Sequence, residues 1–426
     1  MVNQEMQKGQ AKPSLQIAIY CIAAMIYLGI WLLMSSNENA YLQLDSYDYL
    51  LLGQAIFNDF NFPSSFRTPL FPLFVGFWEA LLGLKIQYYI LIQILLALVN
   101  IYLLGRLVSY FLSAKMQLLV MLVFAVELVT AQVANYVLAE TLFSFLLLLA
   151  LNFLVLAQRK QKYAIKYAVI CGVVLGLYAL CRPVGQFIPF VLVVWYFLYK
   201  RSDVNIRTQV LAVCLVIFGT LLSVHAWKFH NYVTKGQYFT SVTMSYNIYN
   251  YRAAWNVAYR DGRSFEDVKD EFHAVRKEFK LNNLQATEYD IGQHFFKEGL
   301  NIIIDTPKET FFQAVRGLVF LYGGIYNGSL DRIFKNQLAK KIAQIYTFLY
   351  NCILYAGILL SVLFIRRLEQ QERSLLIMSG FIVAYYSFFS IGVESYARLR
   401  APFIPYLVII AVVGWMKLWQ FKTRSS

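Results

Sequence analysis

Long apolar segments recur along this chain of 426 residues and limit the folds that it can adopt. An α-helix needs about 20 predominantly apolar residues to cross the hydrocarbon core of a bilayer. The segment 141–157 (TLFSFLLLLALNFLVLA) is such a run, and it shows none of the alternation over about ten residues that marks a membrane β-barrel strand. Only 15% of the residues are charged, whereas soluble domains have about 25%. The sequence therefore predicts an all-α polytopic membrane protein.

About ten membrane-spanning helices are expected. The apolar segments lie near 15–34, 87–105, 116–135, 141–157, 167–181, 184–199, 208–226, 342–365, 374–393 and 402–419. The first of these segments is too long for the apolar part of a typical signal peptide, so we expect it to be a retained helix.

The placement of charge predicts the orientation. With both termini cytoplasmic, the cytoplasmic ends and loops hold 17 Lys and Arg residues but only four acids. Cytoplasmic loops of membrane proteins carry such an excess of basic residues. The formal net charge of +14 is thus mostly a topology signal, and it requires no nucleic-acid partner. The expected location is the bacterial cytoplasmic membrane.

Two segments are expected outside the membrane and divide the chain into domains. Residues 1–226 form an N-terminal transmembrane module, whose first outer loop (35–87) has the pattern of interfacial amphipathic helices. Residues 227–341 carry 16 basic and 12 acidic residues and predict a mixed, mainly helical extracytoplasmic domain. Residues 342–426 supply the C-terminal transmembrane helices.

Several charged residues fall at the predicted outer face, against the positive-inside bias. The bases are Arg67, Lys85, Arg182, Arg398 and Arg400, and the acids are Asp45, Asp48, Asp59, Glu140 and Glu394. Ionisable groups at membrane depth are costly and indicate function. Guanidinium groups suit a phosphate, and a carboxylate suits a general base. The pattern predicts group transfer from a phospholipid-like donor, and no nucleotide-binding motif accompanies it.

Five motifs in order resemble those of the GT-C class of integral-membrane glycosyltransferases, in the branch of protein O-mannosyltransferases and the lipid A aminoarabinose transferase. The motifs are 45–49 (DSYDY), 67–72 (RTPLFP), 140–143 (ETLF), 172–183 (GVVLGLYALCRP) and 398–405 (RLRAPFIP). The resemblance covers most of the chain. It implies an inverting glycosyltransferase that moves a monosaccharide from a polyprenyl-phosphate donor to an extracytoplasmic acceptor, which is a lipid, a glycan or a protein.

The resemblance also implies roles for individual residues. Asp45 is expected to be the general base. The expected substrate-binding residues are Tyr49, Asp48, Arg67, Glu140, Arg182, Arg398 and Arg400, with Arg182, Arg398 and Arg400 holding the leaving phosphate. Several relatives have Glu directly after the aspartate, whereas this chain has Ser46. Without that acid pair, and without a histidine cluster, we expect no metal cofactor.

Structural interpretations compete with these roles. An aspartate before an apolar helix often caps it, which is the alternative for Asp45. Asp48 is either a rival base or a solvated residue of the same helix. Glu140 opens a predicted span, where a negative charge also favours the helix dipole.

The arginines have structural alternatives too. Arg182 and Arg400 are also suited to snorkelling toward lipid headgroups. Arg398 is either a phosphate ligand or a partner of Glu394, and Arg67 is either a ligand or an anchor of its loop.

A transporter or flippase of a lipid-linked or anionic solute is the alternative function. Such proteins place ionisable groups near the bilayer midplane, on broken helices and often in repeated halves. Here the charges gather at one face and the sequence shows no repeat, which favours the enzyme.

Overall fold

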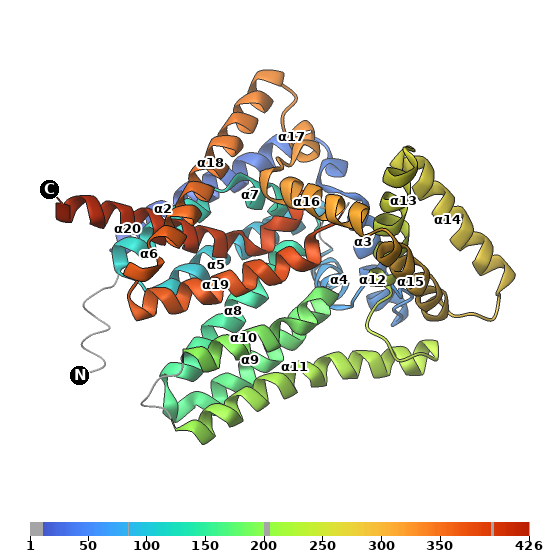
Figure 1. Cartoon of the computed structure of the whole chain (residues 1–426), viewed down its shortest axis with the longest axis horizontal. Coiled ribbons are helices and arrows are strands. Elements are labelled where there is room, and N and C mark those ends of the chain that lie inside the picture. Colours follow the sequence, from blue (N-terminus) through green and yellow to red (C-terminus); the bar gives the residue numbers. More distant parts are fainter. Residues whose placement is uncertain (1–11, 84, 200–204, 393–395, 426) are drawn as a thin grey trace.

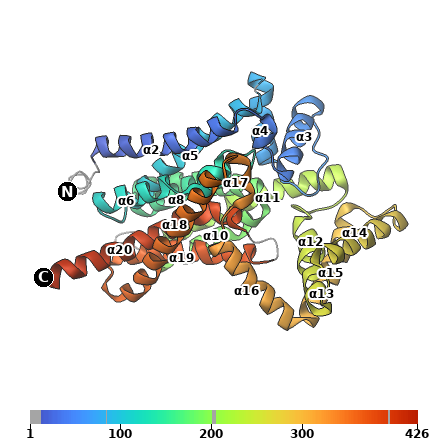
Figure 2. The same cartoon turned by 90° about the horizontal axis from the view of Figure 1, so that it is seen from above.

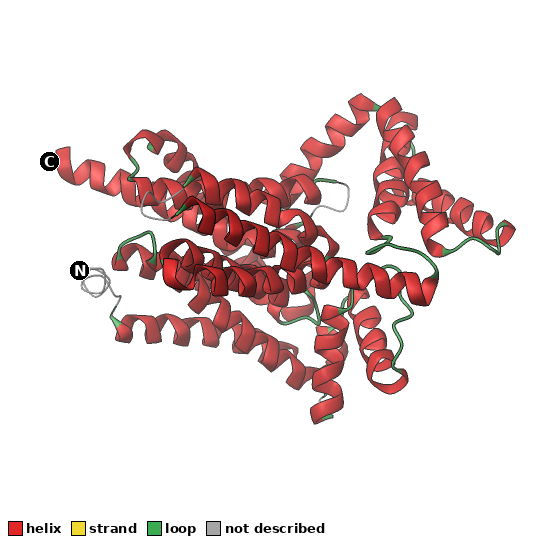
Figure 3. Ribbon diagram, turned by 90° about the horizontal axis from the view of Figure 1, so that it is seen from below, coloured by secondary structure: helices red, strands yellow, loops and turns green. Residues whose placement is uncertain are grey.

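The computed structural model describes residues 12–83, 85–199, 205–392 and 396–425, and within these ranges every regular element is a helix (Figure 3). Eight helices there are long and apolar enough to cross a bilayer, if the short η6 (Ala397–Phe403) is counted with α20. They are α2 (Pro13–Met34), α5 (Ile86–Ser109), α8 (Glu140–Arg159), α9 (Ala164–Cys181), α11 (Ile206–Lys235), α18 (Gln337–Leu363), α19 (Gln370–Ser390) and α20 (Ile404–Ser425). The prediction of an all-α polytopic membrane protein is confirmed.

Two of the ten predicted spans differ from a straight, full-length helix. The segment predicted at 116–135 is a pair, α6 (Ala114–Ala125) and α7 (Leu128–Ala134), bent by 59°. The segment predicted at 184–199 is a shorter apolar helix, made of η3 (Pro183–Phe187) and α10 (Ile188–Leu198). The described residues therefore contain eight full-length spans, or nine with the bent pair, rather than ten.

Glu127 explains the bend. Its carboxylate accepts hydrogen bonds from the backbone N–H groups of Val129 (3.1 Å) and Thr130 (2.6 Å), so it caps α7 and starts a new helix direction. The carbonyls freed at the end of α6 are also bonded, because Tyr350 Oη donates to Val123 O at 3.0 Å and Tyr346 Oη donates to Val126 O at 2.7 Å. The break thus leaves these polar groups satisfied inside an apolar bundle.

The two ends of the helix bundle differ in what they carry. Helix α2 begins and helix α20 ends at the same end (Figures 1 and 2). At the opposite end lie α3 (Leu44–Asp59) and α4 (Leu70–Leu82). Beside them lies a helical domain formed by α12 (Thr243–Asn247), η4 (Ile248–Ala253), α13 (Ala254–Asp261), α14 (Phe265–Asn282) and α15 (Glu288–Asp305). Helices α16 (Pro307–Gly323) and α17 (Asn327–Ile333) lead from this domain back to α18.

Glycines set the spacing of the helices that position the site. A Cβ on Gly172 of α9 would lie 2.8 Å from the Leu215 carbonyl oxygen of α11, so the two backbones touch there. Gly53 of α3 would similarly meet the Pro72 carbonyl oxygen of α4 at 2.9 Å. Small residues allow such close packing in membrane helices. Gly172, the first residue of the 172–183 motif, thus lets α9 pack closely against α11.

Helix α11 continues beyond the predicted domain boundary at 226 and ends at Lys235. Its C-cap is Gly236, whose φ of 74° lies in the left-handed region that favours glycine. The chain then turns toward α3 and α4, where it meets the loop between them.

The arrangement predicts the result of a topology experiment. Cysteine introduced at Lys162, between α8 and α9, or at Glu369, before α19, should be labelled from the cytoplasmic side. Cysteine at Ser64 or Lys280 should be labelled only from the other side. Impermeant maleimide on intact cells makes the measurement, and external labelling at Lys162 would contradict the orientation.

Candidate active site

Five charged residues from four helices and one loop meet at the end of the bundle that carries α3 and α4. Asp45 is in the first turn of α3, and Arg67 is in the loop that follows this helix. Glu140 is the first residue of α8, Arg182 is the C-cap of α9, and Arg398 is on η6. The acids thus lie at helix N-termini and Arg182 lies at a C-terminus, which is the arrangement that helix dipoles favour.

Asp45 is held by two arginines. Arg67 Nη2 donates to Asp45 Oδ1 at 2.8 Å, and Arg398 Nη2 donates to Asp45 Oδ2. The alternative in which Asp45 caps its helix is wrong, because Gln43 is the N-cap residue, and it is the Ser46 hydroxyl that accepts from the Gln43 N–H, at 2.9 Å. The Asp45 side chain is therefore committed to the charged cluster, where it remains 29% exposed.

Arg398 links the two acids. Its Nε donates to Glu140 Oε1 at 2.7 Å while its Nη2 pairs with Asp45. Arg182 Nη1 donates to the same Glu140 oxygen at 2.9 Å. Glu394 lies outside the described residues, so its pairing with Arg398 stays an alternative. The second oxygen of Glu140 is buried and has no hydrogen-bond partner in the described part of the chain.

Arg67, Asp48 and Tyr49 form the outer edge of the cluster. Arg67 donates to Asp48 Oδ2 through Nε (3.2 Å) and Nη2 (2.8 Å). The Arg67 guanidinium also lies 4.9 Å from the centre of the Tyr49 ring, a cation–π contact. Tyr49 is buried and Asp48 is exposed. The Arg67 guanidinium therefore contacts Tyr49 on its protein side and Asp48 on its solvent side.

Arg400 does not join this cluster, contrary to the expectation that it holds the same phosphate as Arg398. It is buried, and its Nη1 donates to the carbonyl oxygens of Leu321 (3.2 Å) and Tyr322 and to Tyr355 Oη (2.9 Å). A 3₁₀-helix turns about 120° per residue, so side chains two residues apart point in different directions. Arg400 instead bonds the last carbonyls of α16 and anchors the element that presents Arg398.

Charge determines the ionisation of Asp45. Burial raises the pKa of Asp45, but Arg398 and Arg67 outweigh burial through their charges and hydrogen bonds. The pKa is held well below its usual range as a result. In this resting arrangement Asp45 is ionised and weakly basic.

The donor set does not resemble a metal site. No group of three or more His, Cys, Asp or Glu side chains with metal-binding geometry occurs among the described residues. The position after Asp45, which is acidic in several GT-C relatives, is Ser46, and its hydroxyl is buried against the Val137 carbonyl at 2.9 Å. Between Asp45 and Glu140 stands the Arg398 guanidinium, which brings positive charge to the place where a cation would bridge the two acids.

The sequence did not reveal two further neighbours of the cluster. The Tyr396 ring lies 5.8 Å from the Arg398 guanidinium, and Tyr326 packs against Tyr396 at a ring distance of 6.3 Å. Tyr396 could have been predicted as a neighbour of the cluster, because it lies two residues before Arg398. Tyr326 carries no signal, because it comes from the distant segment between α16 and α17.

No protein-family model and no curated protein matches this sequence. Its fold matches solved structures of an archaeal oligosaccharyltransferase. The structure of AglB from Archaeoglobus fulgidus, with an inhibitory peptide and a dolichol-phosphate, has a TM-score of 0.55 and 15% identity, covering 96% of this chain and 51% of that chain. The Archaeoglobus fulgidus oligosaccharyltransferase with Zn and sulfate gives 0.54 and 17%, covering 94% and 49%.

A third structure, ArnT from Cupriavidus metallidurans bound to undecaprenyl phosphate, has 14% identity over 93% of this chain and 77% of that chain. Its TM-score of 0.38 is below the level at which a shared fold is inferred. The archaeal matches show that the chain has the fold of the GT-C class of membrane proteins, as the motifs predicted. The chain spans about half the length of the archaeal enzyme.

Proposed function

We propose that this chain is an inverting membrane glycosyltransferase. It transfers a monosaccharide from a polyprenyl-phosphate donor to an acceptor outside the cytoplasm, which is a lipid, a glycan or a protein. The observation that carries the proposal is the ion-paired cluster of Asp45, Glu140, Arg182 and Arg398 at the end of a GT-C fold. Asp45 supplies the base, and the arginines supply the phosphate site.

The reaction follows from these groups. The acceptor oxygen or nitrogen attacks the anomeric carbon from the face opposite the phosphate, and Asp45 takes the acceptor proton. The bond between the anomeric carbon and the phosphate oxygen breaks, so the polyprenyl phosphate leaves with the electron pair. Arg182 is 24% exposed and makes one ion pair within the described chain, so in this proposal its other N–H groups donate to the phosphate. Stabilising the negative charge of a leaving group is a large catalytic term.

Donor binding activates the base. Among the described residues of the resting cluster, three arginines (Arg67, Arg182 and Arg398) balance three carboxylates (Asp45, Asp48 and Glu140), so these six side chains carry no excess positive charge. A phosphate must therefore compete with the carboxylates for guanidinium N–H groups. Each guanidinium contact that moves from Asp45 to the phosphate raises the pKa of Asp45. Asp45 becomes a better base when the donor is present.

The position of the cluster favours an enzyme over a transporter. Asp45, Glu140 and Arg182 lie at helix termini and Arg398 lies on the short η6, whereas transporters bind their cargo near the midplane. Metal independence remains part of the proposal, and the bridging position of Arg398 supports it.

The phosphate site can be tested without knowing the sugar. Arg182→Ala should weaken binding of undecaprenyl phosphate to the purified protein by roughly 10- to 100-fold, because a hydrogen bond to a charged group contributes about 1.5–3 kcal/mol. Arg182→Lys should recover only part of this loss, since lysine lacks the planar fork. Thermophoresis in detergent measures the affinity, and an unchanged affinity in Arg182→Ala would place the phosphate elsewhere.

Arg400 provides a control, because its substitution should affect the stability of the protein more than its affinity for the lipid. Arg400→Met removes the donor to the Leu321 and Tyr322 carbonyls and should destabilise the protein by about 1–3 kcal/mol. Because Arg400 would act on the phosphate only through the position of Arg398, the folded variant should lose much less affinity for undecaprenyl phosphate than Arg182→Ala does. Thermal unfolding in detergent gives the first quantity and thermophoresis gives the second. A folded Arg400→Met protein that no longer binds the lipid would return Arg400 to the phosphate site.

A further inference from the structure

The loop that carries Arg67 (residues 61–69, between α3 and α4) is held by a segment distant in sequence. Phe66 O accepts hydrogen bonds from Thr243 Oγ1 at 2.6 Å and from Ser241 Oγ at 2.5 Å. The Phe66 ring packs edge-on against Tyr246, with 5.2 Å between ring centres. The residue immediately before Arg67 is thus fixed through both its backbone and its side chain.

The two preceding carbonyls are held in the same way. Ser65 O accepts from the Val242 N–H at 3.0 Å, and Ser64 O accepts from Lys235 Nζ at 2.5 Å. Ser64 also connects this anchor to Arg67, because its hydroxyl accepts a hydrogen bond from the Arg67 N–H at 3.0 Å. Three successive carbonyls of the loop are therefore bound by residues 235–243, which connect α11 to the helical domain.

Such anchoring matters because Arg67 has to meet three partners at once. Its guanidinium pairs with Asp45 and Asp48 and covers the Tyr49 ring. A surface loop without regular structure would otherwise sample many conformations, and fixing each residue costs conformational entropy. The hydrogen bonds to Ser64, Ser65 and Phe66 offset this cost in advance of catalysis.

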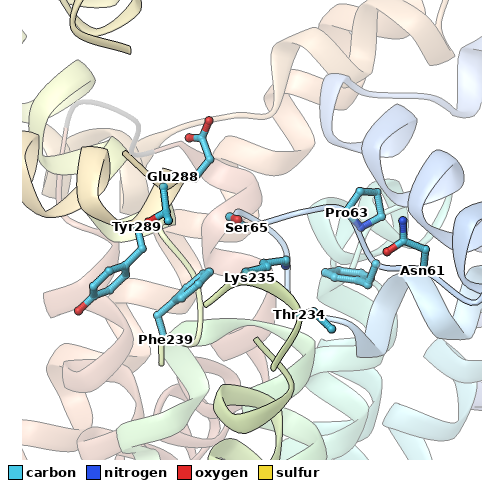
Figure 4. Close-up of a pocket in the computed structure, with 10 residues that line it drawn as sticks. Asn61, Pro63, Ser65, Thr234, Lys235, Phe239, Glu288 and Tyr289 are labelled. Carbon is cyan, nitrogen blue, oxygen red and sulfur yellow. The ribbon is translucent and has the colours of Figure 1, made fainter. Parts of the chain in front are cut away.

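Lys235, one of the anchoring residues, borders a pocket of about 310 Å³ that Ser65 of the loop also lines. Figure 4 shows Phe239 and Tyr289 on one side of it and Pro63 on the other, with Lys235 and Ser65 between them. One group that holds the loop, the Lys235 ammonium, therefore lies at this pocket next to the helical domain.

We propose that Lys235, Ser241 and Thr243 are positioning residues for Arg67. They fix the backbone of residues 64–66 and thereby set the ion pairs that Arg67 makes with Asp45 and Asp48. The consequence for donor binding rests on the proposed function, whereas the structural coupling does not. Ser241 and Thr243 share one acceptor, so deleting either hydroxyl leaves a bond and deleting both leaves the Phe66 carbonyl without these donors.

Hydrogen exchange measured by mass spectrometry on the full chain in detergent tests the structural coupling. The double variant Ser241→Ala/Thr243→Val should exchange severalfold faster in peptides covering 61–69 and also in peptides covering 44–50, which contain Asp45 and Asp48. Arg67→Gln should also speed hydrogen exchange in the peptides covering 44–50. Thr240→Val is the matched control, because Thr240 bonds to Trp227 Nε1 through its carbonyl (3.0 Å). Restoring the hydroxyl with Ser241→Ala/Thr243→Ser should return exchange toward the wild-type rate.

Three results would overturn the proposal. In the first, the double variant leaves the hydrogen-exchange rates of both peptides unchanged. In the second, the double variant speeds exchange in peptide 61–69 alone, although Arg67→Gln speeds exchange in peptide 44–50. Arg67→Gln could also leave 44–50 unchanged, which would show that Arg67 does not hold the first turn of α3.

Undecaprenyl phosphate binding supplies the functional readout. The double variant should bind the lipid about tenfold more weakly, and the same change should add little in an Arg67→Gln background. Equal loss in both backgrounds would mean that the segment acts independently of Arg67 and would contradict positioning. If Arg67→Gln and Arg182→Ala both bind normally, the proposed function fails, and hydrogen exchange still decides the coupling.

Discussion

Asp45→Asn should remove nearly all sugar transfer without weakening the affinity for polyprenyl phosphate. Asparagine retains the size of the side chain and an oxygen that can accept from Arg398, but it cannot take the acceptor proton. Removing a general base costs roughly 10²–10⁴-fold in rate, and we expect the upper part of this range because Glu140 is engaged with two arginines. The measurement is transfer of labelled sugar by purified protein.

Asp48→Asn is the matched control for this prediction. Asp48 is three residues away on the same helix and also pairs with Arg67, but it is 56% exposed and has no contact with Arg398 in the described structure. We expect its substitution to reduce the rate far less. Addition of EDTA should change neither result. A dead Asp48→Asn enzyme beside an active Asp45→Asn enzyme would reverse the assignment of the base.

Arg398→Gln should have the second large effect, on stability as well as on rate. The Arg398 side chain is 7% exposed and bridges Asp45 and Glu140. Removing one partner of a buried ion pair costs about 3–5 kcal/mol, because a charge is left buried without compensation. Thermal unfolding in detergent should show this loss, and a stability equal to that of the wild type would contradict the bridging geometry.

The same variant should change the pH dependence of transfer. Arg398 lowers the pKa of Asp45 and burial raises it, so losing Arg398 moves this pKa upward. A base with a higher pKa becomes protonated at higher pH. The acid limb of the rate profile should therefore shift to higher pH in Arg398→Gln, provided that the folded fraction is corrected for. A shift in the opposite direction would show that Asp45 is not the group that titrates.

Much of the fold follows from apolar run length. Each of the ten predicted segments is helical over most of its described residues, because a buried backbone in lipid must satisfy its own hydrogen bonds. The break between α6 and α7 was missed because Glu127 has to be recognised as a helix cap within an apolar run. The shortness of α10 was missed because apolar content alone does not show where a helix ends.

The site was predictable from the sequence where a charged residue near the membrane has few structural explanations. Asp45, Glu140, Arg182 and Arg398 were selected as charges out of place near a membrane, and the structure brings them together. The same reasoning does not separate Arg400 from Arg398, although the structure directs Arg400 to the end of α16, because the direction of a side chain depends on the local helix type. The roles of Ser241 and Thr243 were invisible in the sequence, since hydroxyl residues in loops are common.

The most direct test follows a labelled polyprenyl-phosphate sugar, extracted from cells that make the protein, after it is added with acceptor membranes to proteoliposomes containing the purified chain. We predict that the label leaves the lipid and joins an acceptor with inverted anomeric configuration, that free polyprenyl phosphate accumulates in equal amount, and that both changes disappear in Asp45→Asn. Movement of the intact labelled lipid across the bilayer, with no bond broken and no dependence on Asp45, would contradict the account and identify a transporter.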